Sequence, residues 1–221
     1  KYKTKNHLQR SIMKEYLKIT NEDNMELMKR YPDNHFDLAI VDPPYGIDIN
    51  SSGRLGHYGG KGKKWDNEIP NDIYFKELNR VSKNQIIWGG NYFNLQPTRC
   101  FLIWDKQQPE GVSFASCEFA WTSFNKSAKT FYMRPQNADE NRIHPTQKPR
   151  ALYQWLLTNY AEPNFKILDT HLGSGSIAIA VDSVNKIEKM NLTLTACELD
   201  KEYYQTATKR IKEQTTWNSL F

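Results

Sequence analysis

The sequence has few cysteines, no long apolar run and no strong excess of one charge. The three cysteines, Cys100, Cys117 and Cys197, lie far apart and form no C-x-x-C pair, which argues against a disulfide framework and a cysteine zinc site. A reducing cytosol fits this usage best. No apolar run approaches the roughly 20 residues that span a bilayer, and the N-terminus lacks the apolar core of a signal peptide.

The charged residues and the histidines exclude few classes of function. Lys and Arg exceed Asp and Glu by 30 to 25, so the composition is compatible with an anionic partner but does not require one. The five histidines form no cluster with ligand spacing, and no metal site is predicted.

Apolar periodicity over the 221 residues predicts one domain of the α/β class. The last third alternates strictly between helix and strand, which is typical of a doubly wound sheet, whereas residues 99–133 predict strands with no helix between them. The chain after Glu213 is expected to be frayed. Expected strands cover about 16–20, 36–42, 85–88, 100–104, 115–123, 128–133, 166–169 and 192–198, and expected helices begin near 24, 71, 149, 176 and 202.

A strand that stops at two prolines is the most informative stretch. The buried run Leu38–Val41 is followed by Asp42-Pro43-Pro44-Tyr45. Proline has no N–H for a ladder and a fixed φ, so Asp42 and Tyr45 are held on a stiff corner at the carboxyl end of the strand. Ligands bind at that edge in open α/β sheets. The alternative is a simple strand end with a packed tyrosine.

A glycine turn between a strand and a helix is the second informative stretch. Gly173 and Gly175 lie in it, and Glu198 follows one strand later, at about the spacing of an acid that hydrogen-bonds ribose hydroxyls. Together these features predict an adenosine-containing ligand; the alternative is a plain turn and a solvated acid. Gly173-x-Gly175-x-x-Ala178 also satisfies the loose dinucleotide fingerprint, but only one strand and one helix follow it. One adenosyl group and a second substrate therefore suit the chain better.

The order of the motifs resembles the beta class of amino-methyltransferases. These are the DNA adenine-N6 and cytosine-N4 enzymes in which the catalytic motif precedes the cofactor motif. The resemblance covers about residues 19–211 and rests on Asp42-Pro-Pro-Tyr45, His144-Pro-Thr-Gln-Lys-Pro149, the glycine turn 169–176 and Glu198-Leu-Asp200-x-x-Tyr203. It implies a Rossmann-like S-adenosylmethionine methyltransferase fold. The expected sheet is mostly parallel and seven-stranded, with its last strand antiparallel and helices on both faces.

The resemblance implies transfer of a methyl group from S-adenosylmethionine to N6 of an extruded adenine in double-stranded DNA. Asp in the first position of the catalytic motif favours adenine, because cytosine-N4 enzymes more often have Ser. Cytosine-N4 is the nearest alternative, followed by an RNA base. A nicotinamide-dependent oxidoreductase and a DNA-binding module without catalytic activity represent other classes. A homodimer and a cognate restriction endonuclease are left open.

Residue roles carry over by the same resemblance. The catalytic residues are Asp42, Pro43, Pro44 and Tyr45. The Asp42 carboxylate and the Pro43 carbonyl accept from the amino N–H groups, and Tyr45 stacks on the base. Thr146 and Gln147 are expected at the amino-acid group of the methyl donor, with Lys148 near its carboxylate. The full set expected at the cofactor is Asp23, Asp42, His144, Thr146, Gln147, Lys148, Asp169, Gly173, Ser174, Gly175, Ser176, Glu198 and Asp200.

Two loops and one substitution complete the expectations. A basic, glycine-rich loop after the catalytic corner is predicted to bind DNA phosphates through Arg54, Lys61, Lys63 and Lys64, the alternative being a solvated surface run. We expect one methyltransferase domain with a catalytic half at about 16–142 and a cofactor half at about 143–213. Short loops at about 46–69 and 133–143 stand in place of a large target-recognition domain. His171 replaces an aromatic residue common in the family, and a packing role is expected for it, the alternative being a polar contact with the cofactor.

Overall fold

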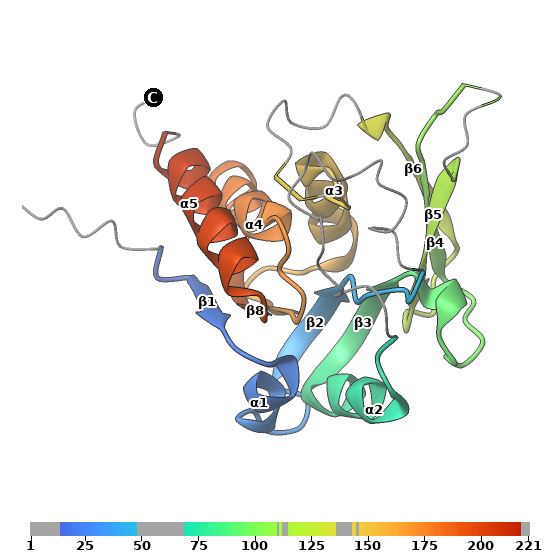
Figure 1. Ribbon diagram of the computed structural model, residues 1–221, viewed down its shortest axis with the longest axis horizontal. Helices are drawn as coiled ribbons and strands as arrows, with labels where there is room; N and C mark the ends of the chain where they lie inside the picture. The colour runs from blue at the N-terminus through green and yellow to red at the C-terminus, as the bar shows by residue number, and fades with distance from the viewer. Residues whose placement is uncertain are drawn as a thin grey trace, which may run out of the picture.

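The computed structural model describes residues 14–47, 69–109, 111, 115–135, 143–144 and 146–217. One eight-stranded sheet runs through this part of the chain in the order β1-β8-β7-β2-β3-β5-β4-β6 (Figure 1). Its strands are β1 (Leu17–Asn21), β2 (Phe36–Val41), β3 (Ser82–Trp88), β4 (Phe101–Asp105), β5 (Cys117–Thr122), β6 (Lys129–Tyr132), β7 (Lys166–Asp169) and β8 (Thr193–Glu198).

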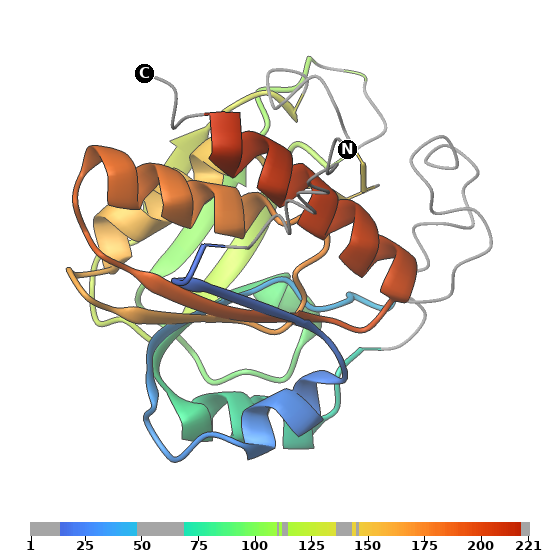
Figure 2. The same ribbon diagram turned by 90° about the vertical axis from the view of Figure 1, so that its left-hand side faces the viewer.

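Helices cover both faces of the sheet, in agreement with the α/β prediction. α1 and α2 lie on one face, and α3, α4 and α5 lie on the other, as Figures 1 and 2 show. Each face has its own apolar core, one formed with α3–α5 and the other with α1 and α2. The helices are α1 (Asn24–Lys29), α2 (Asp72–Val81), α3 (Arg150–Tyr160), α4 (Ser176–Ile187) and α5 (Lys201–Trp217), with a short 3-10 turn at Gly90–Tyr92.

The sheet differs from the expected one in two respects. It has eight strands among the described residues rather than seven, because β6 pairs in parallel with the outer edge of β4. Only one strand runs against the others, as expected, but it is not the last. β5 is the antiparallel strand, and it lies inside the sheet between β3 and β4. The expected fraying after Glu213 is also wrong as far as Trp217, where α5 ends, and Thr215 is buried; residues 218–221 lie outside the described part of the chain.

The central strand β2 positions the catalytic corner. It pairs in parallel with β7 on one side and β3 on the other, and the side chains of Leu38, Ala39 and Ile40 are fully buried. The strand ends at Val41, directly before the two prolines. Because β1, β8, β7 and β2 are all parallel, their carboxyl ends meet at one edge of the sheet. No helix in the described part of the chain is long and apolar enough to cross a membrane.

The glycine turn before α4 should tolerate no side chain at Gly175. This residue has φ of 76°, and an added Cβ would lie 2.7 Å from Cδ1 of Ile211 in α5. We expect Gly175→Ala to lower the free energy of unfolding through both backbone strain and overlap. Gly111→Ala is the matched control, because Gly111 also has positive φ (83°) but no atom within 4 Å of the added Cβ.

Urea unfolding of both variants separates the two causes. Gly111→Ala should cost about 1 kcal/mol from strain alone, and Gly175→Ala at least about 1 kcal/mol more. Equal losses in the two variants would contradict the packing of α5 against the turn.

Candidate functional site

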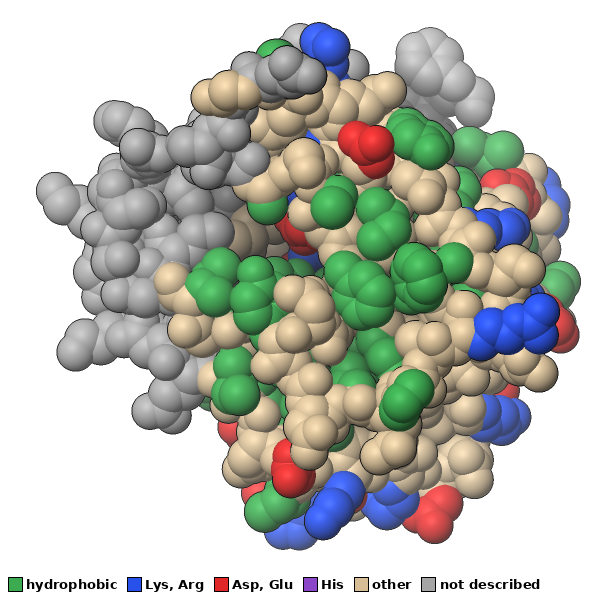
Figure 3. Space-filling model, turned by 90° about the vertical axis from the view of Figure 1, so that its right-hand side faces the viewer, with side chains coloured by type: hydrophobic (Ala, Val, Ile, Leu, Met, Phe, Trp, Pro, Cys, Tyr) green, Lys and Arg blue, Asp and Glu red, His purple; other side chains and the backbone are tan. Residues whose placement is uncertain are grey.

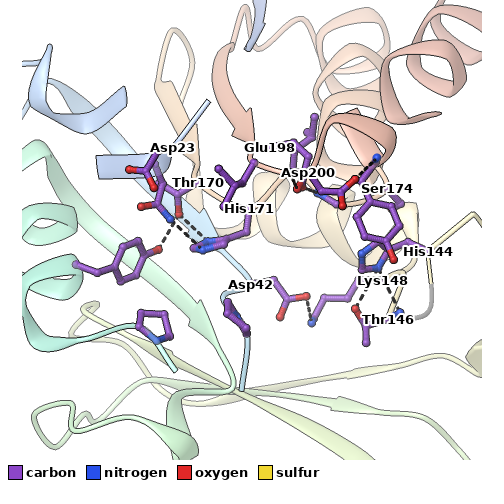
Figure 4. Close-up of a pocket in the computed structure, with 18 of the residues that line it drawn as sticks. Asp23, Asp42, His144, Thr146, Lys148, Thr170, His171, Ser174, Glu198 and Asp200 are labelled. Atoms are coloured by element: carbon purple, nitrogen blue, oxygen red, sulfur yellow. Dashed lines mark hydrogen bonds and ion pairs between the residues drawn. The ribbon is translucent and has the colours of Figure 1, made fainter. Parts of the chain in front are cut away.

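A cavity of about 700 Å³ opens at the carboxyl edge of the sheet. Its size is within the range of small-molecule sites. Figure 4 shows its labelled side chains converging from the ends of β1, β2, β7 and β8 and from the segment before α3. The lining residues are Glu22, Asp23, Asn24, Met25, Asp42, Pro44, Ile69, Pro70, Asn71, Tyr74, His144, Thr146, Gln147, Lys148, Tyr153, Thr170, His171, Leu172, Gly173, Ser174, Glu198, Leu199, Asp200 and Tyr203.

Backbone hydrogen bonds fix the acids on the β1–β8 side of the cavity. Glu198 accepts from the N–H of Gly173 at 2.9 Å and from the N–H of Asp200 at 3.0 Å, so it joins the glycine turn to the end of β8. Burial raises the pKa of Glu198 above its ordinary value. Asp200 accepts from two N–H groups of the first turn of α5, and Asp23 caps α1 in the same way. These carboxylates are therefore held in place before any ligand binds.

The charge of the cavity favours a cationic ligand. Among the described residues, five carboxylates line it, and Lys148 is the one Lys or Arg that does. The glycine turn before α4, where a dinucleotide would place its pyrophosphate, reaches the cavity through Gly173 and Ser174, whereas Gly175 and Ser176 at the start of the helix do not line it. Arg210 donates to the carbonyl of Ser174 and to Oγ of Ser176, while Gly175 packs against α5. This arrangement disfavours the dinucleotide alternative. The five acids are Glu22, Asp23, Asp42, Glu198 and Asp200.

The catalytic corner contains a network of charged and hydroxyl groups. Asp42 accepts from the Tyr45 hydroxyl at 2.6 Å through Oδ1, and its Oδ2 lies 2.5 Å from Nζ of Lys148. Lys148 also donates to the Tyr45 hydroxyl and lies 3.1 Å from Oε2 of Glu118. On its other oxygen, Glu118 pairs with Lys106 at 2.7 Å. Lys148 is therefore paired with Asp42 and Glu118, and its place near the carboxylate of the methyl donor stays a prediction.

Burial and these partners set the protonation of the network. Burial raises the pKa of Asp42, although the ammonium of Lys148 opposes the shift. Burial alone would raise the pKa of Glu118 too, but Lys148 and Lys106 outweigh it and hold that pKa at about 2. Burial lowers the pKa of Lys148, but the two carboxylates overcome this and raise it. Lys148 and Glu118 are therefore charged at neutral pH.

His171 combines packing with polar contacts. Its ring lies edge-on to Tyr74, while Nδ1 is 2.9 Å from the Thr170 hydroxyl and Nε2 is 3.2 Å from Nδ2 of Asn24. Burial lowers the pKa of His171 to about 4, so the ring is neutral. The expected packing role is therefore only part of what this side chain does.

Most of the residues expected at the cofactor meet in this cavity. Ten of the thirteen expected residues line the cavity, whereas Asp169, Gly175 and Ser176 do not. Of the catalytic motif, Asp42 and Pro44 line the cavity, Pro43 is buried, and Tyr45 reaches the site through its hydroxyl. The ten are Asp23, Asp42, His144, Thr146, Gln147, Lys148, Gly173, Ser174, Glu198 and Asp200. The predicted DNA contacts Arg54, Lys61, Lys63 and Lys64 lie outside the described residues.

Three residues of the corner were missed by reasoning from the sequence. Glu118 and Lys106 extend the charged network, and Tyr92 stacks on Tyr45 with ring centroids 5.0 Å apart. A signal existed for Glu118, because in the alternation of β5 it falls on the face of the buried Ala120, opposite to Phe119 and Trp121. An acid on the inward face of a strand needs a partner.

Asp169 should make the stability of the protein depend on pH. Burial raises the pKa of this carboxyl to about 8, above the ordinary 3.8. Folding thus favours its neutral form, so the stabilisation is complete below about pH 4 and is lost as the pH rises to about 8. Asp169→Asn cannot ionise, and its amide oxygen can still accept from the N–H of His171.

Chemical unfolding of both proteins between pH 4 and 8 tests this sign. The free energy of unfolding of Asp169→Asn, relative to the parent, should rise by roughly 1 kcal/mol per pH unit. Asp33→Asn, at an exposed carboxylate, should show no such trend. A difference that is constant with pH would contradict the buried neutral carboxyl.

Comparison with known proteins agrees with this geometry. A family model described as DNA methylase matches residues 86–209. Type II methyltransferase M.BglII of Bacillus subtilis is 24% identical over 280 residues, covering 98% of this chain and 75% of that protein. Type II methyltransferase M.HinfI of Haemophilus influenzae is 22% identical, covering 88% of this chain and 68% of that protein.

Solved structures share the fold. The M1.HpyAVI–SAM complex superposes with a TM-score of 0.56 at 21% identity, covering 88% of this chain and 99% of that one. PvuII DNA methyltransferase (cytosine-N4-specific) gives a TM-score of 0.58 at 12% identity, with 91% and 93% covered. The family model matches more than half of this chain, so the chain belongs to the N6/N4 family of DNA methylases.

Proposed function

We propose that this protein is a DNA methyltransferase that transfers the methyl group of S-adenosylmethionine to N6 of adenine. Membership of the N6/N4 family of DNA methylases gives the reaction class. The observation that supports a working site best is the Asp42 carboxylate, which stands on a two-proline corner at the cavity and is oriented by Tyr45 and Lys148.

The residues of the cavity fit S-adenosylmethionine. The sulfonium and the amino group of this molecule are both positive, and the cavity is lined mainly by carboxylates. Glu198 accepts a backbone N–H on each oxygen and also interacts with the N–H of Leu199, so its carboxylate is held where the sequence predicts an acid for the ribose hydroxyls. Bound here, S-adenosylmethionine supplies a methyl group activated by a positively charged sulfur.

Asp42 is proposed to activate the amino group of the base. The exocyclic nitrogen of adenine is a poor nucleophile because its lone pair is delocalised into the ring. Oδ1 of Asp42 accepts from Tyr45 and Oδ2 is held by Lys148, and a carboxylate oxygen with a single partner can exchange that partner for an amino N–H. As the nitrogen–carbon bond forms and the electrons of the carbon–sulfur bond pass to sulfur, Asp42 stabilises the positive charge on nitrogen. The proton that the nitrogen then loses passes to Asp42 and on to solvent.

An aromatic platform beside Asp42 is suited to an extruded base. Tyr45 and Tyr92 are nearly parallel, at 13°, and Tyr92 is 45% exposed. The Tyr45 ring fits closely over Gly89, where any side chain would overlap it. Figure 3 shows further hydrophobic side chains around a hollow on the side of the molecule formed by β4–β6. We propose that the pair acts as one stacking surface, with Tyr92 offering the outer face to the base.

Cytosine-N4 is the second candidate for the methylated atom. One observation favours it, namely that a structure with this fold is that of a cytosine-N4-specific enzyme. Asp at position 42 favours adenine, since the family's cytosine-N4 enzymes more often have Ser there. Both bases present an exocyclic amine to Asp42, so the corner alone accommodates either.

Mapping of modified bases tests the proposal directly. DNA from cells that express the protein should contain N6-methyladenine at one sequence context and none in cells without it. N4-methylcytosine at that context would move the assignment to the second candidate. Unmodified DNA, together with no transfer of labelled methyl groups to duplex DNA in vitro, would overturn the proposed activity.

Asp42→Ala should abolish transfer without affecting the fold. Loss of the acceptor for the amino group should lower kcat by at least about a hundredfold. Thermal unfolding and calorimetric binding of S-adenosylmethionine should show a folded protein that still binds the methyl donor. Asp33→Ala removes an exposed carboxylate from the same half of the chain and should leave kcat unchanged. Full activity of Asp42→Ala would show that the corner is misassigned.

A further inference from the structure

Four charged groups of alternating sign form a chain that ends at the catalytic acid. Lys106 pairs with Oε1 of Glu118 at 2.7 Å, Oε2 of Glu118 lies 3.1 Å from Nζ of Lys148, and Lys148 pairs with Oδ2 of Asp42 at 2.5 Å. The side chain of Lys148 is only 2% exposed. Two ammonium groups thus balance two carboxylates, and Asp42 competes with Glu118 for the same buried cation.

The antiparallel strand brings Glu118 to this position. Glu118 is the second residue of β5, which runs against β3 and β4, so the start of β5 lies at the edge where those strands end. Lys106 directly follows β4 at the same edge and donates its backbone N–H to Ser116. Glu118 does not line the cavity, so it acts on the site through its ion pair with Lys148 and through its charge.

The two carboxylates hold Lys148 unequally. Oε2 of Glu118 is buried and makes no hydrogen bond with good geometry in the described part of the chain, although Nζ of Lys148 is close. The short bond of Lys148 is the one to Asp42. A buried acceptor without a hydrogen bond is costly, so a small movement of Nζ toward Glu118 would satisfy this oxygen. The same movement would free Oδ2 of Asp42.

We propose that Glu118 is a positioning residue that takes over Lys148 when the amino group of the target base reaches Asp42. This inference rests on the proposed methyl transfer. The N–H of the base replaces Lys148 at Oδ2, and Nζ moves to Oε2 of Glu118, so no buried charge is left unpaired in either arrangement. Lys106 keeps Glu118 in place from the outer side. Lys148 stays protonated throughout, and no bond other than hydrogen bonds is exchanged.

Removal of the Glu118 charge should therefore slow transfer and change its pH dependence. In Glu118→Gln, Lys148 has Asp42 as its one carboxylate partner and releases it less readily. We expect kcat to fall roughly tenfold to a hundredfold. The affinity for S-adenosylmethionine should stay the same, because Glu118 is outside the cavity lining.

The pH profile and the melting temperature together separate positioning from simple support of the fold. The negative charge of Glu118 contributes to the raised pKa of Asp42, so its loss lowers that pKa and moves the acid limb of the kcat profile to lower pH. A merely structural role would also lower the melting temperature, whereas loss of positioning lowers kcat at an unchanged melting temperature. The titratable groups that act on Asp42 from the packed elements are Tyr45, Glu118, Lys148, Tyr153 and Asp169.

The test measures labelled methyl transfer to duplex DNA as a function of pH, together with calorimetry and thermal unfolding. Glu118→Asp retains the carboxylate and should recover part of the lost kcat. Glu77→Gln is the control, because it removes a carboxylate from an ion pair on α2 that is outside the site. The double variant Lys106→Gln/Glu118→Gln removes both signs of charge, and it replaces Glu118→Gln if the latter fails to fold.

The outcomes are distinct. A lower kcat with an acid limb at lower pH and unchanged affinity for S-adenosylmethionine supports the role of Glu118. Parental kcat and an unshifted limb in Glu118→Gln, or in the double variant, overturn it while leaving the proposed function intact. If the parent protein itself transfers no methyl group to any DNA, the proposed function fails, and this inference fails with it.

Discussion

A buried ammonium shared by two carboxylates is the interaction on which the rest of the site depends. Nζ of Lys148 lies between Asp42 and Glu118, with its side chain almost wholly covered. Taking such charges out of water costs several kcal/mol each unless their partners are in place. The corner therefore requires three separate segments to meet within hydrogen-bond distance: the end of β2, the start of β5 and the segment before α3.

Strand order explains how distant residues reach one edge. β8 and β7, from the end of the chain, lie side by side between β1 and β2, from its beginning. The expected catalytic and cofactor halves consequently share one sheet and its two cores. Parallel strands collect the acids at their carboxyl ends. The single antiparallel strand then adds Glu118 to the same edge from the opposite chain direction.

The residues of the site whose effect is local could be predicted from the sequence, whereas those placed by strand pairing could not. The prolines after Asp42 and the glycines before α4 act on their own backbone, so their consequences could be predicted. The contact of Glu118 with Lys148 depends on which strand β5 joins and in which register, which no short stretch specifies. The place of β6 as an eighth strand of the sheet was missed for a related reason. Its residues were predicted to be extended, but its pairing with the free edge of β4 is a tertiary choice.

The charge of the cavity also constrains how DNA reaches it under the proposed function. Five carboxylates repel phosphate, so the backbone of the nucleic acid is held outside while a neutral base enters. The amino group of that base is a hydrogen-bond donor, which is the group an acid-lined site accepts most readily. The same carboxylates attract the positive sulfonium. The negative charge of the cavity thus suits both the methyl donor and the base. Because phosphate is repelled, the base must leave the duplex to reach Asp42 under the proposed function.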